Sequence, residues 1–158
     1  MSTHEITYVR EVTARYSSPR KAPEHLYAPG HVASFCRRLL RDNVREHFIA
    51  LYLGPRNEVL AYQVVSIGCA DQALVHPREV FQPAVLVGAV SVIVAHNHPS
   101  GNVSTSVEDD ELTRRLHAAG KLLGIRLVDH VVFTHESCFS YDAVWTNEDF
   151  KSLSERKP

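Results

Sequence analysis

The chain has 158 residues, of which 44% are hydrophobic and 22% charged, a composition typical of a globular protein and not of a disordered chain. Its formal net charge of −1 at pH 7 argues against a strong general affinity for nucleic-acid backbones or anionic membranes. The length is sufficient for one domain with its own core, so we predict a single domain over residues 1–158.

The first half of the chain shows two kinds of hydrophobic periodicity. Residues 6–12 alternate loosely and suggest a first strand. From residue 31 to about 43, apolar residues recur at helical spacing beside several arginines, which predicts an amphipathic helix. The arginines favour a solvated helix face over a nucleic-acid contact. Residues 45–68 then predict two strands joined by a turn at residues 54–57.

The second half alternates helices and strands. A helix that begins near Pro77 is expected to be bent or short, because Pro83 disturbs its continuation. Residues 90–96 are almost continuously apolar, which predicts a central strand. A glycine-terminated helix and two strands are expected over residues 106–123, 125–134 and 137–143. This alternation predicts an α/β fold in which helices flank a mixed sheet.

Three features bear on the location of the protein. Residues 1–12 lack the charged and then apolar layout of a signal peptide. The longest apolar run, residues 84–95, is too short to span a bilayer. The cysteines are widely spaced and odd in number, so we expect reduced thiols at Cys36, Cys69 and Cys138. A cytoplasmic protein without membrane association is therefore expected.

A group of metal-binding residue types follows the predicted central strand. His96 and His98 stand two residues apart on that strand, so their side chains project to one face. A helix is predicted from Ser106 with Asp109 in its first turn, and the intervening loop can fold this helix start back toward the histidines. Two imidazoles and one carboxylate leave a fourth position open, which is the pattern of a catalytic zinc site.

The same residues also have an explanation without a metal. Ser106 and Asp109 fit a variant of the capping box at a helix start, and a His-x-His pair alone is weak evidence of a site. The complete spacing is far more specific than either part: His-x-His, seven residues, serine, two residues, aspartate.

This spacing matches the JAMM metalloprotease signature, and the sequence resembles the JAB/MPN domain family. The flanks resemble its RadC-like branch in particular: VHPREVFQPA, AHNHPSG, ELTRRL and LLGIRLVDHVVF. The resemblance covers roughly residues 30–144 and implies the JAB/MPN, cytidine-deaminase-like architecture. It leads us to expect a short single-domain form, without the additional N-terminal helical segment that RadC proteins usually carry.

The resemblance also implies roles for individual residues. It implies a zinc ion bound by His96, His98 and Asp109, and a serine, Ser106, that assists the transition state. It further implies a glutamate on an upstream strand that activates water. Glu46 is the best match, at the start of a strand about fifty residues before the histidines. Glu79 is the competitor, although an acid at a helix start has a sufficient capping explanation.

Three polar residues near this motif have simpler interpretations. Asp129 and His130 could form a pair that orients a metal ligand. We favour the alternative, in which both are satisfied polar residues within or beside a sheet. Asp110 follows the proposed ligand directly and is expected to be a solvated charge.

The leading functional hypothesis is a zinc-dependent hydrolase of the JAMM type, cleaving a peptide or isopeptide amide in a protein or peptide substrate. A second hypothesis is a DNA-repair-associated or nuclease-like protein, prompted by the RadC label and the letters His-Asn-His. A nuclease of that kind disperses its histidines over a ββα unit, and no strong nucleic-acid binding is expected here. A third is a non-catalytic JAB/MPN interaction module, against which the complete ligand set argues. A homo-oligomer is compatible with all three.

Overall fold

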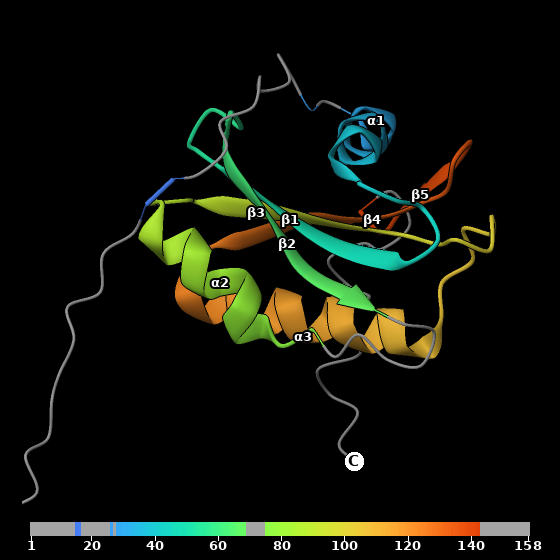
Figure 1. Ribbon diagram of the computed structural model, residues 1–158. Helices are drawn as coiled ribbons and strands as arrows, with labels where there is room; N and C mark the ends of the chain where they lie inside the picture. The colour runs from blue at the N-terminus through green and yellow to red at the C-terminus, as the bar shows by residue number, and fades with distance from the viewer. Residues whose placement is uncertain (1–14, 17–25, 27, 69–74, 143–158) are drawn as a thin grey trace, which may run out of the picture.

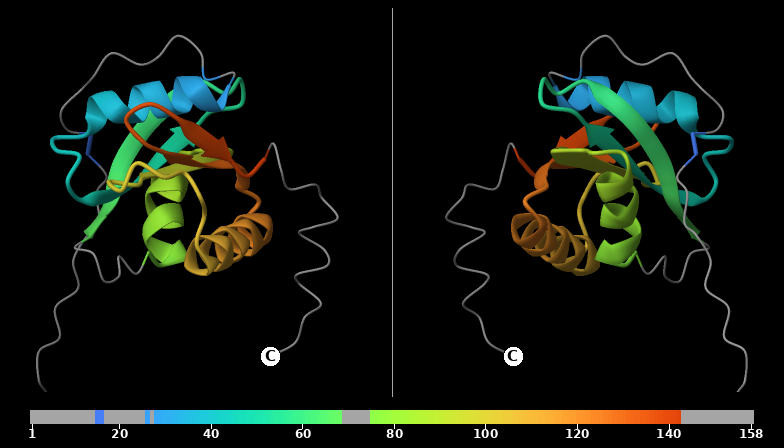
Figure 2. Two further views of the ribbon diagram at one scale, coloured as in Figure 1. Left: turned by 90° about the vertical axis from the view of Figure 1, so that its right-hand side faces the viewer. Right: turned by 90° about the vertical axis from the view of Figure 1, so that its left-hand side faces the viewer.

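A computed structural model describes residues 15–16, 26, 28–68 and 75–142 of the chain. These residues form one five-stranded sheet with the strand order β2-β1-β3-β4-β5. Three helices cover it, with α1 on one face and α2 and α3 on the other (Figures 1 and 2). The elements are α1 (Pro29–Leu39), β1 (Glu46–Leu53), β2 (Val59–Gly68), α2 (Pro77–Leu86), β3 (Ser91–Asn97), α3 (Val107–Leu123), β4 (Arg126–Phe133) and β5 (Cys138–Ser140).

The sheet is mixed, which confirms the predicted fold class. Strand β3 pairs in parallel with β4, whereas the other neighbouring strands pair antiparallel. Strand β3 occupies the middle of the sheet and all seven of its residues are buried, as its apolar sequence predicts. Because parallel strands need a crossover connection, α3 carries the chain from the end of β3 back to the start of β4.

Alternating side chains divide the interior into two cores. Ile49, Leu51, Ile93 and Ala95 pack on the side of α1. The intervening positions of the same strands, such as Val94, pack on the side of α2 and α3. Because the strand periodicity is two, β3 residues of even number point toward the α2–α3 layer. This face therefore receives the histidines that follow Val94.

The helices agree with the sequence pattern except at the C-terminal end of α1. Helix α1 ends at Leu39, before the predicted limit near residue 43, because Leu40 adopts an extended conformation. Helix α2 includes Pro83 and ends three residues later at Leu86, so it is short, as predicted. Helix α3 begins after its N-cap Ser106 and ends at Gly124, where a φ of 70° requires the conformational freedom of glycine.

Some predictions concern segments beyond the described residues. The predicted strand at residues 6–12 and the cysteine Cys69 lie outside the described residues. Cys36 and Cys138 are free thiols, as predicted. Within the described ranges, no helix combines the length and the apolar character needed to cross a membrane.

Candidate metal centre

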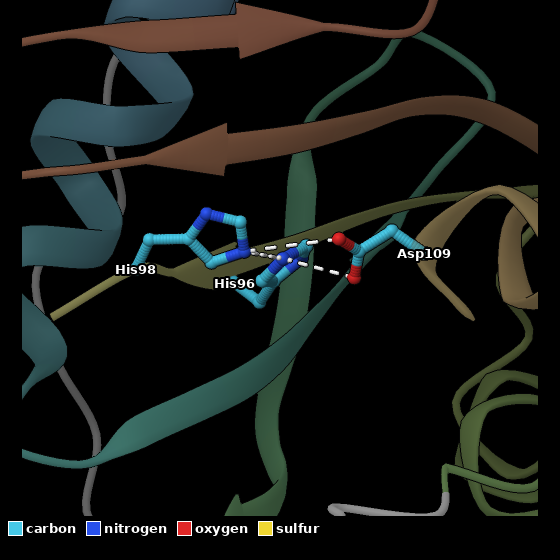
Figure 3. Close-up of side chains that lie close together, drawn as sticks. All are labelled: His96, His98 and Asp109. Atoms are coloured by element: carbon cyan, nitrogen blue, oxygen red, sulfur yellow. Dashed lines mark hydrogen bonds and ion pairs between the residues drawn. The ribbon is translucent and has the colours of Figure 1, made fainter. Parts of the chain in front are cut away.

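Two imidazoles, one at the end of β3 and one just beyond it, lie close together on the α2–α3 face of the sheet. His96 is completely buried within the strand, whereas the side chain of His98, just beyond the strand end, is 16% exposed. The backbone N–H of His98 donates to the Phe133 carbonyl at 2.9 Å, which ties this position to β4. The Nε2 atoms of the two histidines lie 2.9 Å apart (Figure 3).

The loop between β3 and α3 folds back, as predicted, and brings a carboxylate to the same point. Gly101 has a φ of 83°, and its N–H donates to the His98 carbonyl at 3.1 Å to close a turn. In the first turn of α3, Asp109 places Oδ1 3.2 Å from His96 Nε2 and Oδ2 3.8 Å from His98 Nε2 (Figure 3). The three potential ligand atoms all lie within 4.8 Å of one another.

The chemistry of this donor set fits a divalent metal ion. Nδ1 of His98 lies 2.8 Å from the Asn102 carbonyl, which can only accept, so this nitrogen donates, and in the neutral tautomer with this proton Nε2 offers its lone pair. Burial lowers the pKa of His96 to about 4, against an opposing effect of Asp109, so His96 is neutral at physiological pH. Neutral imidazoles and a carboxylate are the forms that bind zinc. The three residues could therefore hold a metal ion.

Ser106 and Asp109 also form the capping box that provided the alternative explanation. The Ser106 hydroxyl accepts from the Asp109 N–H at 3.1 Å and donates to Asp109 Oδ2 at 2.7 Å. The Ser106 N–H donates to the same Oδ2 at 2.8 Å. These bonds involve one carboxylate oxygen and leave Oδ1 directed at His96. Capping and metal binding are therefore compatible, and the cap fixes the orientation of the candidate ligand.

Glu46 is the first residue of β1 and lies on the histidine face. Strand β1 runs antiparallel to β3 with Phe48 opposite His96, so continuing this register by two residues brings Glu46 opposite His98. Burial raises the pKa of the Glu46 carboxyl, while the charges of His98 and Asp109 act on it in opposite directions. Its competitor Glu79 is exposed in the first turn of α2.

Sequence comparison places this arrangement in a family. The sequence profile of the RadC-like JAB domain matches residues 26–146, which is most of the chain. The chain belongs to the RadC-like JAB domain family. It is 45% identical over 118 residues to a UPF0758 protein of Trichlorobacter lovleyi, which covers 75% of this chain and 51% of that protein. A UPF0758 protein of Geobacter sulfurreducens is 40% identical over 137 residues, covering 84% of this chain and 60% of that protein.

A third relative, a UPF0758 protein of Rubrobacter xylanophilus, is 45% identical over 105 residues, which cover 66% of this chain and 46% of that protein. The chain thus spans about half the length of these relatives. The names of these relatives state no reaction.

One residue that the sequence analysis missed is Asn97, between the two histidines. Its buried side chain points to the opposite side of β3, where Oδ1 accepts from the His47 N–H at 2.7 Å and Nδ2 donates to the Arg45 carbonyl at 2.9 Å. These two backbone groups flank Glu46 in the chain. Asn97 therefore fixes the start of β1 in the RadC-like JAB domain, and with it the backbone that carries the candidate base.

We expect Asn97→Ala to lower the free energy of unfolding by about 1–3 kcal/mol, because a buried backbone donor loses its partner. Chemical denaturation of the two proteins measures this difference. Asn43→Ala, at an exposed position, is the control and is expected to change stability little. Equal midpoints for wild type and Asn97→Ala would contradict the role of this side chain.

Of the three polar residues near the motif, two agree with the favoured interpretation and one corrects it. Asp129 is a satisfied polar residue, as favoured, and accepts from Ser140 Oγ at 2.8 Å. His130 is likewise a satisfied polar residue within the sheet, and one of its partners is a candidate ligand, because its Nε2 lies 2.8 Å from His96 Nδ1. Asp110 is not merely a solvated charge, because its Oδ1 accepts from the Tyr141 hydroxyl at 2.6 Å. These contacts join residues more than thirty positions apart, which no local pattern indicates.

Proposed function

We propose that this RadC-like JAB domain is a zinc-dependent hydrolase that cleaves a peptide or isopeptide amide. The proposal depends on one observation, the convergence of His96, His98 and Asp109 to within 4.8 Å beside a half-buried glutamate. These three residues would hold the zinc ion. When bound, zinc supplies Lewis acidity that makes water a stronger acid and polarises the substrate carbonyl.

Glu46 provides the proton transfer. Its carboxylate accepts a proton from the attacking water and delivers it to the leaving amine, so one residue acts first as base and then as acid. Burial raises the pKa of this carboxyl above its ordinary value. A higher pKa strengthens the base and brings it closer to the operating pH, which favours both transfers.

Ser106 stabilises the charge that develops on the substrate oxygen. In the structure its proton is donated to Asp109 Oδ2, while its oxygen accepts from the Asp109 N–H. Rotating the hydroxyl proton toward an oxyanion leaves the second bond in place, because a hydroxyl has one donor and two acceptor positions. The helix cap therefore persists while the hydroxyl assists the reaction.

A cleavage screen on the zinc-loaded protein tests this function. Libraries of peptides, isopeptide-linked conjugates and nucleic acids are incubated with wild-type protein, with and without a chelator. Chelator-sensitive cleavage of an amide substrate supports the proposal. Cleavage confined to nucleic acids contradicts it and supports the nuclease hypothesis, whereas a zinc-loaded protein that cleaves nothing supports the interaction module.

Binding to duplex DNA is expected to be weak, with a dissociation constant of roughly micromolar or above at physiological salt. The 17 Lys and Arg residues are balanced by 18 Asp and Glu residues, so the chain has no net positive charge to displace the counterions of DNA, and the affinity should also depend only weakly on salt concentration. Fluorescence anisotropy at several salt concentrations measures both quantities. Nanomolar binding at physiological salt would contradict this expectation.

A further inference from the structure

The inner side of His96 contacts two residues that the proposed reaction does not use. His96 Nδ1 lies 2.8 Å from Nε2 of His130 on β4. His130 Nδ1 lies 2.6 Å from Oγ1 of Thr113 on α3. Thr113 Oγ1 donates to the Asp109 carbonyl oxygen at 2.7 Å. This series of contacts, the relay, joins one candidate ligand to the backbone of another.

Proton positions along the relay depend on one another, because each contact accommodates a single proton. The Asp109 carbonyl can only accept, so it takes the Thr113 hydroxyl proton. The Thr113 oxygen then accepts from His130 Nδ1, and His130 presents the lone pair of Nε2 to His96. His96 must donate from Nδ1, which leaves a lone pair on the Nε2 atom that faces Asp109.

If the hydrogen bonds of the relay ran in the opposite direction, His96 could not bind a metal ion. If Thr113 donated to His130 Nδ1, then His130 Nε2 would carry a proton and donate to His96 Nδ1. The remaining His96 proton would sit on Nε2, where it would block metal coordination. Thr113, His130 and His96 are all completely buried, so solvent does not offer them alternative partners. The direction of the relay therefore decides whether His96 can bind a metal.

The surrounding packing restricts rotation of the imidazoles. The His130 ring stacks on Tyr141, with centroids 5.0 Å apart and an interplanar angle of 11°. Phe48 stacks on His96 at 6.0 Å and 13° and meets the His130 ring edge-on at 5.5 Å. Aromatic side chains enclose both rings and fix their orientation. Only the positions of the protons on the two imidazoles can then change at this contact.

We propose that Thr113 and His130 are positioning residues that hold His96 in the tautomer and orientation required for metal binding. The inference rests on the proposed metal site and extends it inward by two residues. Histidine ligands commonly donate their second N–H to a fixed partner, and losing such a partner typically lowers metal affinity about 10–100-fold. Here the partner is another imidazole, whose own proton position is determined by a threonine.

Thr113→Val tests the relay because valine has nearly the shape of threonine and carries a methyl group in place of the hydroxyl. We expect the zinc affinity, measured by competition with a chelator, to fall about 10–100-fold. Thr113→Ser retains the hydroxyl and should retain the wild-type affinity. Ser140→Ala removes another buried hydroxyl, which donates to Asp129, and should leave zinc affinity unchanged.

Nitrogen-15 NMR of histidine-labelled, zinc-loaded protein provides a readout that a purely structural role would not move. His130 should carry its proton on Nδ1 in wild type and Thr113→Ser, and Thr113→Val should lose this preference. A wild-type His130 protonated on Nε2 would overturn the relay, even if Thr113→Val failed to fold. Wild-type affinity in Thr113→Val would also overturn it while leaving the metal site intact. A wild-type protein that takes up no zinc would instead contradict the site itself.

Discussion

His96→Ala/His98→Ala is expected to reduce bound zinc from one equivalent per chain to background. The double substitution removes both imidazoles from the candidate site and leaves Asp109 as its remaining ligand. A single carboxylate does not hold zinc at low concentration, because protein zinc sites depend on three or four donors acting together. Elemental analysis of proteins purified in zinc and then dialysed measures the stoichiometry. His and carboxylate ligands suit zinc, although they also accept other divalent ions.

The control for this experiment removes the same number of imidazoles elsewhere. His31 and His135 are both exposed, so His31→Ala/His135→Ala tests whether the chain binds zinc through its general histidine content. This control should retain one equivalent. An unchanged metal content in His96→Ala/His98→Ala would refute the assignment of the ligands, and loss of zinc in both variants would indicate nonspecific binding.

The sequence predicted those helices and strands whose positions are determined by residues close to them in the chain. Helix α3 carries its own start and stop signals, because Ser106 caps one end and Gly124 adopts the left-handed conformation at the other. The position of β3 was also evident from its own residues, because a continuously apolar segment predicts a buried central strand. The end of α1 was less predictable, since the residues after Leu39 retain helical spacing although Leu40 turns to an extended conformation.

The candidate metal ligands could be predicted from the sequence, whereas the residues that contact and orient them could not. His96 and His98 share a face by strand periodicity alone, which sequence reveals directly. The contact between His96 and His130 depends on the parallel register of β3 and β4, in which His130 stands opposite Val94. That register is a tertiary property, so a histidine within an apolar strand gave no signal of its partner. Thr113 was similarly hidden, because it contacts His130 across 17 positions of the chain, and the periodicity of a helix does not indicate such a contact.

Glu46→Gln is expected to abolish hydrolysis while the protein keeps its fold and its zinc. The amide has nearly the size and polarity of the carboxylate but cannot accept a proton from water. Loss of a general base typically lowers the rate about 10²–10⁴-fold. The comparison requires a substrate from the cleavage screen and proteins loaded equally with zinc, with kcat measured at saturation. Thermal unfolding and zinc content should match those of wild type.

Glu79→Gln separates the two candidate bases. Glu79 is exposed in the first turn of α2, where an acid favours the helix start through its dipole, so its amide variant should keep kcat close to wild type. Glu46 instead lies half-buried on the histidine face, where its carboxyl interacts with the charges of His98 and Asp109. The opposite result, in which Glu79→Gln loses activity and Glu46→Gln retains it, would transfer the role of base to Glu79. The ligand assignment would survive that outcome, because neither glutamate belongs to the His96, His98 and Asp109 group.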